Sequence, residues 1–374
     1  MRRREFISGI ISAAAVPALV PTSLWASENS LAKLAAAKGL LYGCAVKSRI
    51  LREDAGFRAA VAAEVGILVP EYELKREVLQ PAPGRYDFSG SDYIFSAAIR
   101  MKQRVRGHTL AWYAANPPWL PEFLSSRGTT SEKESVLTDY ITAVTTRYKG
   151  RVHSWDVVNE AIEPDDGRRD GMRSKNIWFD ALGENYIALA FFAAKAVDSE
   201  AILMLNEFGV EAPVRWNERR RYAVLKLLDR LKAQNVPIEG FGIQGHLHPY
   251  RDGFDPEIFR RFIRDLEGYN LKLMVTELDV SDRGGSSVDP NVRDTDVAAV
   301  TRDFLDVALD SQNTIGILTW GLSDRYTWLA SSEKYRWPDG QYPRALPLDS
   351  NFQKKPMWAA IAESLEKTAN RSGR

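Results

Sequence analysis

Two apolar segments of the sequence each lead into a glutamate. One is SWDVVNE at residues 154–160, which ends in Glu160, and the other is MVTELD at residues 274–279, which contains Glu277. A carboxylate at the end of a buried strand is costly unless it is paired, hydrogen-bonded or used in chemistry. Two of them, far apart in the sequence, indicate one shared site. A pair of carboxylates across a cleft is what acid–base and nucleophilic cleavage of a glycosidic bond requires.

The two glutamates are predicted to have different roles. In a retaining glycosidase the carboxyl groups lie about 5–5.5 Å apart, and in an inverting one about 6.5–9.5 Å apart. One group must be protonated and the other ionised, and like-charge repulsion with partial burial separates their pKa values. We assign Glu160 as the acid/base and Glu277 as the nucleophile. The alternative, two structural carboxylates held by Arg or Lys, is less favoured because amide and imidazole residues accompany both.

The amide and imidazole residues have two interpretations each. Asn159 is placed to bond a sugar hydroxyl beside the reacting carbon, although an asparagine alone is more often a turn residue. Gln244 and His246 are two residues apart and point the same way on an extended backbone. We expect His246 to hold Glu277 ionised and Asp279 to orient His246.

Two further questions concern the histidines. His246 and His248 also permit a metal-pair interpretation, but a zinc site needs a third ligand and none has a suitable spacing. His108 is interpreted either as a core histidine or as a sugar contact. We therefore expect no metal.

The ten tryptophans suggest a surface for sugar rings. Trp112, Trp119, Trp320 and Trp328 fall on or just past strand ends. Indole faces can stack on the C–H faces of sugars, whereas the alternative is that bulky aromatics only fill the mouth of the fold. For Trp320 and Trp328 we favour a sugar platform, and for Trp155 we favour the core.

Strand-like and helix-like patterns alternate along the chain. Eight repeats of this alternation predict an α/β fold with a single (β/α)₈ TIM barrel rather than an open doubly wound sheet, which usually has a glycine-rich turn after its first strand. The first predicted strand is instead followed by KSRI at residues 47–50. The predicted strands are Leu41–Val46, Ile67–Val69, Arg104–Leu110, Ser154–Val158, Ala201–Leu205, Gly240–Gln244, Leu271–Thr276 and Ile315–Trp320. The predicted helices are Asp54–Glu64, Ser91–Lys102, Ser131–Lys149, Tyr186–Val197, Glu218–Gln234, Pro256–Leu266, Val292–Leu309 and Pro356–Thr368.

Polar residues gather at one end of these strands. A barrel of this kind carries its active site at the carboxyl ends of the strands, so the clustering favours an enzyme. The residues in strand order are Glu71 and Lys75, His108 and Trp112, Asn159 and Glu160, Asn206 and Glu207, Gln244 and His246, Glu277 and Asp279, and Trp320.

Composition excludes several classes of protein. The chain has 374 residues and a formal net charge of +1, so there is no basic field to favour nucleic acid. Its single cysteine, Cys44, excludes an internal disulfide, and 26% charged with 45% hydrophobic residues is typical of a soluble globular protein. We expect a monomer that binds a polysaccharide or oligosaccharide.

Residues 1–26 have the composition of an export signal. The start is basic and residues 10–26 are apolar and then small. The arrangement RREFI at residues 3–7 resembles a twin-arginine signal. Pro17 and Pro21 argue against an uncleaved membrane anchor. The prediction is therefore an exported protein, periplasmic or secreted, with no membrane contact after signal removal and one catalytic barrel over residues 31–370.

Five segments of the chain form a recognisable set. They are GHTLAW at 107–112, WDVVNEA at 155–161, GIQGHL at 242–247, TELDV at 276–280 and TWGLSD at 319–324. Together they resemble glycoside hydrolase family ten, the β-1,4-xylanases, over about residues 41–361. The resemblance implies retaining endo-hydrolysis of xylan without a cofactor. It also implies sugar-binding or supporting roles for Glu71, Lys75, His108, Trp112, Asn159, Gln244, His246, Trp320 and Trp328. We expect Asp279 and Asn206 to be supporting residues.

The sequence departs from the family pattern on the glycone side. Tyr72 stands where the family carries an asparagine that holds the second glycone sugar, and Tyr113 and Ala115 replace a histidine and a glutamine. NEFG at residues 206–209 replaces the usual Asn-Asp-Tyr-Asn. We therefore expect the cleavage chemistry to be kept and the glycone subsites to be altered. The alternatives are a related retaining β-glycanase that acts on another polysaccharide and a non-catalytic sugar-binding barrel.

Overall fold

The computed structural model describes residues 30–126 and 128–371, so the predicted export signal at residues 1–26 lies outside the described residues. Strands and helices alternate along the described chain, and every strand pairing is parallel. The strands are β1 (Leu41–Val46), β2 (Ile67–Pro70), β3 (Arg104–Trp112), β4 (Ser154–Asn159), β5 (Ile202–Glu207), β6 (Gly240–Ile243), β7 (His246–Leu247), β8 (Lys272–Val280) and β9 (Thr314–Thr319).

The sheet closes on itself. Its strand order is β6-β5-β4-β3-β2-β1-β9-β8-β7, and an additional pairing of β6 with β8 completes a barrel of eight strands. The two-residue strand β7 is a continuation beyond β6 that pairs only with β8. The predicted TIM barrel is confirmed, and the open doubly wound alternative is wrong.

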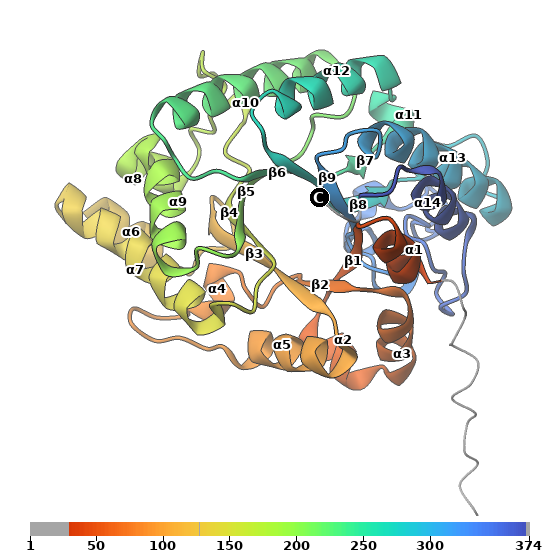
Figure 1. Ribbon diagram of the computed structural model, residues 1–374, viewed down its shortest axis with the longest axis horizontal. Coiled ribbons are helices and arrows are strands. Elements are labelled where there is room, and N and C mark those ends of the chain that lie inside the picture. The colour runs from red at the N-terminus through yellow and green to blue at the C-terminus, as the bar shows by residue number, and fades with distance from the viewer. Residues whose placement is uncertain (1–29, 127, 372–374) are drawn as a thin grey trace, which may run out of the picture.

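Helices form an outer ring around the barrel (Figure 1). The eight predicted helices all form, with ends that differ from the prediction by up to three residues. The prediction missed the additional helices α1, α2, α4, α6, α8 and α11, which are shorter. The helices are α1 (Leu31–Ala37), α2 (Ser48–Glu53), α3 (Ala55–Glu64), α4 (Arg76–Leu79), α5 (Ser89–Met101), α6 (Trp119–Ser126), α7 (Thr130–Tyr148), α8 (Ile177–Leu182), α9 (Asn185–Val197), α10 (Arg215–Ala233), α11 (Pro249–Asp252), α12 (Pro256–Glu267), α13 (Pro290–Ala308) and α14 (Pro356–Lys367).

Two strand ends differ from the prediction in a way that matters for the site. Strand β8 continues to Val280 instead of ending at Thr276, so Glu277 lies within the strand. Strand β6 ends at Ile243, one residue before Gln244, because Gly245 turns the chain with a φ of 76° that favours glycine. The chain then resumes as β7, which places His246 opposite Asp279 of β8.

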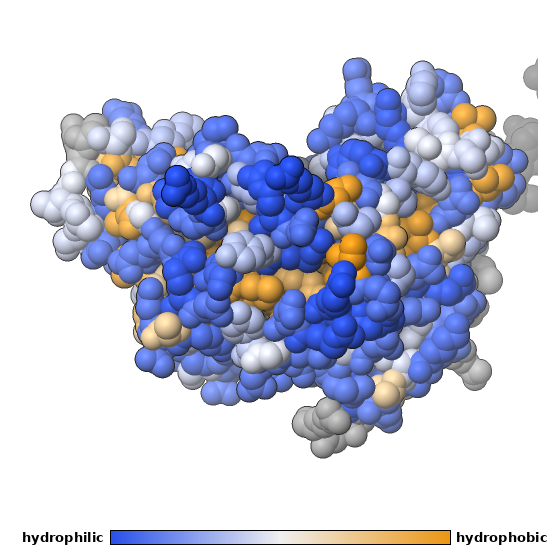
Figure 2. All heavy atoms as spheres, turned by 90° about the horizontal axis from the view of Figure 1, so that it is seen from above, coloured by the Kyte–Doolittle hydropathy of each residue, from blue (hydrophilic) through white to orange (hydrophobic). Residues whose placement is uncertain are grey.

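Apolar side chains fill two layers of the molecule. The larger cluster lies between the strands and the helices, and a smaller one inside the barrel includes Ile67, Val69, Met204 and Met274. On the face shown in Figure 2, hydrophilic residues predominate and hydrophobic residues form small separate patches. Trp155 is fully buried, as predicted, and its ring occupies the space beside Gly107.

Among residues 30–126 and 128–371, no helix combines the length and apolar character needed to cross a membrane.

Candidate active site

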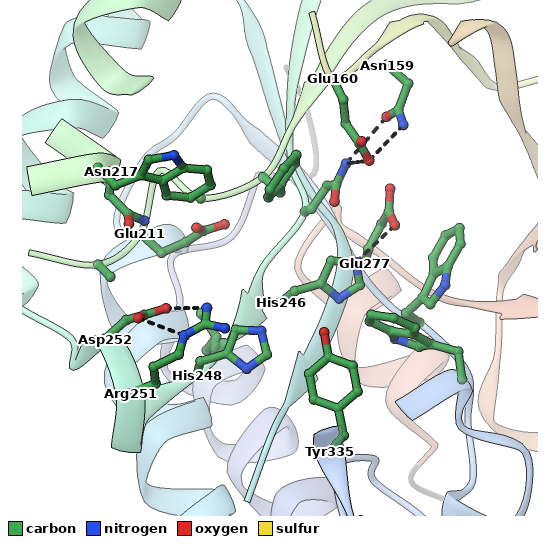
Figure 3. A pocket seen from close by; sticks show the side chains of 18 of the residues that line it. Asn159, Glu160, Glu211, Asn217, His246, His248, Arg251, Asp252, Glu277 and Tyr335 are labelled. Carbon is green, nitrogen blue, oxygen red and sulfur yellow. Dashed lines mark hydrogen bonds and ion pairs between the residues drawn. The ribbon is translucent and has the colours of Figure 1, made fainter. Parts of the chain in front are cut away.

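A cavity of about 580 Å³ opens where the strands end, and it gathers the predicted site residues. Figure 3 shows the carboxylates of Glu160 and Glu277 in one part of this cavity, with Arg251 and Asp252 farther along it. Asn206 and Asp279 are fully buried and bond to side chains that line the cavity. The predicted residues in its lining are Glu71, Lys75, His108, Trp112, Asn159, Glu160, Gln244, His246, Glu277, Trp320 and Trp328.

Glu277 is held from both sides of its carboxylate. Its Oε1 accepts a hydrogen bond from Asn206 Nδ2 at 2.7 Å, and its Oε2 lies 3.2 Å from His246 Nε2. Burial alone would raise the pKa of Glu277, but the hydrogen bond from His246, the nearby His108 and the bond from Asn206 outweigh it and lower that pKa to about 2. Glu277 is therefore ionised across the ordinary pH range.

His246 is oriented as the sequence predicted. Its Nδ1 lies 2.9 Å from Asp279 Oδ1, and Trp328 Nε1 donates to the other oxygen of Asp279 at 2.7 Å. Burial alone would lower the pKa of His246, but Asp279 and then Glu277 outweigh it and raise that pKa well above its usual value. A protonated His246 can donate to both carboxylates at once.

Glu160 has a different and more open environment. Its side chain accepts hydrogen bonds from Asn159 Nδ2 at 3.1 Å, Gln244 Nε2 at 3.0 Å and Trp112 Nε1 at 3.0 Å. None of these three donors carries a charge, whereas the imidazole of His246 bonds to Glu277. The two carboxylates therefore have different hydrogen-bonding environments, as is needed for one carboxyl group to act as an acid and the other as a nucleophile.

Asn206 joins the two carboxylates through a continuous chain of hydrogen bonds. Its Nδ2 donates to Asn159 Oδ1 at 2.8 Å as well as to Glu277, and its Oδ1 accepts from Thr276 Oγ1 at 2.7 Å. Gly242 provides the space, because a Cβ there would lie 2.1 Å from Asn206 Oδ1. The sequence indicated Asn206 as a supporting residue but did not indicate Thr276 or this link.

His108 is buried and also lines the cavity. It is 2% exposed and its Nδ1 lies 2.9 Å from Asp156 Oδ2, whose carboxylate also pairs with Arg106 at 2.5 Å. The same Nδ1 lies 4.0 Å from Glu277 Oε1, at the floor of the cavity. His108 is therefore a satisfied core histidine that also faces the site.

Two lysine side chains lie beside the ring of Tyr72. The ammonium groups of Lys75 and Lys47 lie 4.7 Å and 5.2 Å from the ring centroid of Tyr72, which is 44% exposed. Lys47 pairs with Glu71 at 3.1 Å. Burial raises the pKa of Glu71, against the opposing effect of Lys47, and burial lowers the pKa of Lys75.

Aromatic rings form one wall of the cavity. Trp328 lies edge-on to His246 at 5.4 Å between centroids and to Tyr335 at 5.3 Å, and His248 stacks on Tyr335 at 5.7 Å. The two imidazoles therefore have different aromatic partners, Trp328 for His246 and Tyr335 for His248. Trp119 lies away from this wall in α6, where its Nε1 donates to the Gln80 carbonyl at 3.0 Å.

Several cavity residues were not indicated by the sequence. Tyr335 and Glu211 line it from the segments that follow β9 and β5, and Trp216 lines it from the first turn of α10. The position of such a segment depends on the packing of the whole fold, so no local pattern predicts it. The only signal was the unusual NEFG segment at residues 206–209, of which Phe208 and Gly209 reach the cavity.

A parallel barrel that presents two differently held carboxylates beside an aromatic wall has the arrangement of a glycoside hydrolase. The profile of glycosyl hydrolase family 10 matches residues 30–364 of this chain. The chain therefore belongs to glycosyl hydrolase family 10.

Individual relatives agree with this placement. Endo-1,4-beta-xylanase B of Thermotoga neapolitana is 31% identical over 303 residues, which cover 81% of this chain and 81% of that protein. Beta-1,4-xylanase of Dictyoglomus thermophilum is 34% identical over 303 residues, covering 79% and 80%. Among solved structures, native xylanase 10B from Thermotoga maritima matches this chain with a TM-score of 0.80 and 31% sequence identity. Xylanase 10B from Thermotoga petrophila RKU-1, solved with xylobiose, matches it with a TM-score of 0.80 and 30% sequence identity. Both matches cover 91% of this chain and 98% of the solved xylanase chain.

The low pKa of Glu277 makes a prediction about stability at acid pH. Glu277 has a folded pKa of about 2 and an ordinary value of 4.5, so between these values the unfolded chain binds the extra proton and stability rises with pH. In Glu277→Gln this contribution is absent. The gain in unfolding free energy from pH 3 to pH 6, measured by urea unfolding, is expected to be smaller than in the parent by about 2 kcal/mol.

A matched control is Glu53→Gln, because the Glu53 side chain is 61% exposed. It is expected to keep the pH dependence of the parent. Equal pH dependence in Glu277→Gln and the parent would contradict the strong stabilisation of the ionised Glu277.

Proposed function

We propose that this chain is a retaining endo-β-1,4-xylanase in which Glu277 is the nucleophile and Glu160 is the acid/base. The proposal rests on the different hydrogen-bond donors that hold the two carboxylates. His246, backed by Asp279, holds Glu277 ionised, whereas neutral amide and indole donors surround Glu160. An ionised carboxylate beside one that can carry a proton is what double displacement needs.

In the first step, a carboxylate oxygen of Glu277 attacks the anomeric carbon. The bond from that carbon to the glycosidic oxygen breaks, and Glu160 gives its proton to the departing oxygen. The product is an ester between Glu277 and the glycone. In the second step, Glu160 takes a proton from water, the water oxygen bonds to the anomeric carbon, and the ester bond breaks to release the Glu277 carboxylate.

Asn159 is suited to stabilise the charge that develops in both steps. Its Oδ1 already accepts from Asn206 at 2.8 Å, and this bond fixes the orientation of its amide. The Nδ2 faces Glu160 at 3.1 Å, beside the position of a reacting sugar. A hydrogen bond from this group to the neighbouring sugar hydroxyl would strengthen in an oxocarbenium-like transition state.

The proposed substrate is xylan or a xylo-oligosaccharide. The relatives named above are called xylanases, and the Thermotoga petrophila enzyme was solved with xylobiose. The wall of Trp320, Trp328 and Tyr335 offers apolar faces on which sugar rings can stack. No cofactor takes part in the proposed chemistry.

We further propose that the glycone side is altered. Tyr72 brings a large ring, rather than a short amide, between Lys47 and Lys75 at the edge of the cavity. A tyrosine there takes up space and removes an amide that could bond sugar hydroxyls. Short, decorated or different glycone chains are therefore expected to fit better than plain linear xylan.

The two glutamates give a discriminating prediction. Glu277→Ala should abolish turnover of every substrate. Glu160→Ala should lower kcat/KM by about 10²–10⁴-fold on xylobiosides whose aryl leaving group is poor, because these need a proton. It should change kcat/KM little on a dinitrophenyl xylobioside, whose leaving group needs none. Steady-state kinetics with both substrates checks this, and equal losses on both would remove Glu160 from the acid role.

The substrate class and stereochemistry are tested on the parent enzyme. Reducing ends are assayed after incubation with xylan, β-glucan and mannan, and the first product anomer is identified by proton NMR. Release from xylan with the β-anomer formed first supports the proposal. Activity on glucan or mannan alone would favour a related β-glycanase, an α-anomer would exclude retention, and activity on none would favour a sugar-binding barrel.

Tyr72→Asn tests the altered glycone side. It should raise kcat/KM on linear xylo-oligosaccharides, because it restores an amide and opens space at the edge of the cavity. Tyr342→Asn is the matched control, since Tyr342 is 61% exposed and lies outside the cavity lining. Flat or lower activity in Tyr72→Asn would show that this position does not limit the glycone subsites.

Export and a monomeric state remain part of the proposal. We propose that residues 1–26 direct the protein out of the cytoplasm, on the strength of the RREFI arrangement at residues 3–7. Cell fractionation of the full chain, compared with a variant in which Arg3 and Arg4 are both lysine, should show that the variant stays in the cytoplasm. Equal export of both chains would rule out a twin-arginine signal.

A further inference from the structure

Glu160 has an unusual backbone. Its φ is 58°, in the left-handed region that residues with a side chain rarely adopt. Such a conformation is strained for a residue with a side chain and persists only where the surroundings determine it. Its N–H donates to the Asn206 carbonyl at 2.9 Å, which fixes one side of the residue. The other side must be fixed by the turn that follows.

Arg173 fixes that other side. Its Nε donates to the Glu160 carbonyl at 2.9 Å, and its Nη2 lies 3.4 Å from the Ile162 carbonyl. The backbone N–H of Arg173 also donates to the Ala161 carbonyl at 2.8 Å. Arg173 is only 7% exposed, so these bonds are shielded from water. One side chain therefore bonds to the catalytic residue and to the turn behind it.

Tyr113 covers the guanidinium of Arg173. The centre of that group lies 3.9 Å from the ring centroid, close enough for a stacked cation–π contact. The residue just before Tyr113 is Trp112, whose indole Nε1 donates to Glu160 Oε2 at 3.0 Å. Trp112, the last residue of β3, thus contacts the carboxylate of Glu160, and Tyr113, which follows it, contacts the arginine that bonds to the Glu160 backbone.

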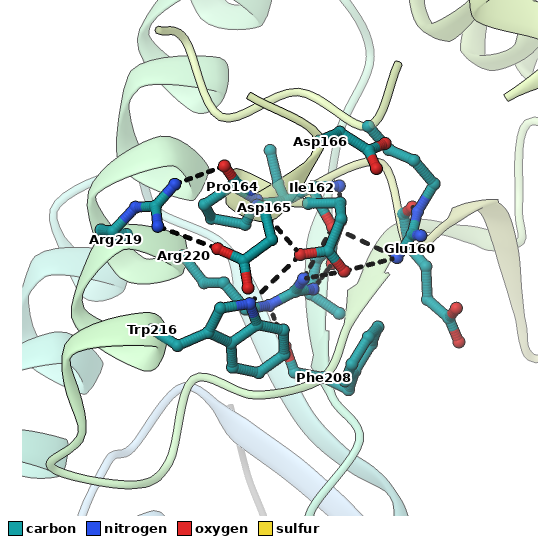
Figure 4. A network of polar contacts seen from close by, with 12 residues as sticks. Glu160, Ile162, Pro164, Asp165, Asp166, Phe208, Trp216, Arg219 and Arg220 are labelled. Carbon is teal, nitrogen blue, oxygen red and sulfur yellow. Dashed lines mark hydrogen bonds and ion pairs between the residues drawn. The ribbon is translucent and has the colours of Figure 1, made fainter. Parts of the chain in front are cut away.

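A second arginine holds the next part of the turn. Arg220 is fully buried and donates to the carbonyls of Ile162 and Phe208, each at 2.7 Å, while its Nη2 pairs with Glu207 Oε2 at 2.6 Å. Figure 4 shows this network between Glu160, Ile162, Phe208 and Arg220. Breaking a buried pair leaves a charge without a partner and is strongly destabilising, so substitution of Arg220 would report mainly on folding.

We propose that Arg173, covered by Tyr113, is a positioning residue for proton transfer by Glu160. The inference rests on the acid/base role proposed above. Arg173 bonds to the backbone of Glu160, whereas Glu277 is held by Asn206 and His246. Loss of Arg173 should therefore displace the acid and leave the nucleophile in place. The Tyr113 departure from the family pattern then replaces a polar side chain with the ring that covers this arginine.

The test compares Arg173→Met with the parent on the two aryl xylobiosides. A small displacement of a reacting group can cost up to about 100-fold in rate. We expect Arg173→Met to lower kcat/KM by about 10-fold or more on the poor leaving group and less than about twofold on the dinitrophenyl substrate. The alkaline limb of the kcat/KM–pH profile, which reports the acid, should also move. A loss of folded protein would lower both rates equally.

Arg219→Met is the matched control. Arg219 neighbours the same network, but its Nη1 bonds to Asp165 at 2.9 Å and its side chain is 46% exposed. It should behave as the parent on both substrates. Thermal unfolding of each variant measures any general loss of stability.

Tyr113→Leu provides a second variant if Arg173→Met does not fold. It removes the ring face and should show the same selectivity for the poor leaving group, and Tyr113→Phe, which restores the ring, should lose less. Equal losses on both substrates, or no loss on either, in whichever variants fold would overturn the inference.

Glu160→Ala separates this failure from failure of the proposed function. If Glu160→Ala discriminates between the leaving groups and Arg173→Met does not, the acid role stands and the positioning role is wrong. If Glu160→Ala itself does not discriminate, the acid role is wrong and the positioning role is lost with it.

Discussion

The hydrogen-bond chain from Glu160 through Asn159 and Asn206 to Glu277 is the constraint around which the site is built. Two carboxylates near one cavity repel each other and are poorly solvated, so each needs its own donors. Asn206 supplies a donor to Glu277 and at the same time fixes the amide of Asn159. The barrel makes this possible because Asn159 and Asn206 occupy paired positions on β4 and β5. The positions of the two carboxylates are thereby coupled.

The sequence predicted the barrel well because its elements are long and repetitive. Eight apolar runs and eight amphipathic patterns leave few alternatives to a closed parallel sheet. The short helices were missed for a physical reason: α2 has six residues and α4 has four, which is too little for a helical period to be visible. The end of β8 was also misjudged, since TELDV at 276–280 contains two carboxylates inside a buried strand.

The site could be predicted as a set of residues but not as an arrangement. The residue types at the strand ends were enough to predict that Glu160, Glu277 and His246 line one cavity. The link through Asn206 depends on how β5 is registered against β4 and β6, and register is decided by the packing of the complete sheet. No pattern in the sequence indicated Arg173, because it lies in an irregular segment and bonds to a backbone carbonyl.

Gly242 has a consequence for how this protein can vary. It faces Asn206 across the β5–β6 pairing, and any side chain at position 242 would collide with that amide. Even an alanine at position 242 would therefore require the side chain at position 206 to move or to be replaced by a smaller one. A directed-evolution library aimed at new substrates should keep this glycine constant and place its substitutions in the exposed loops around the cavity.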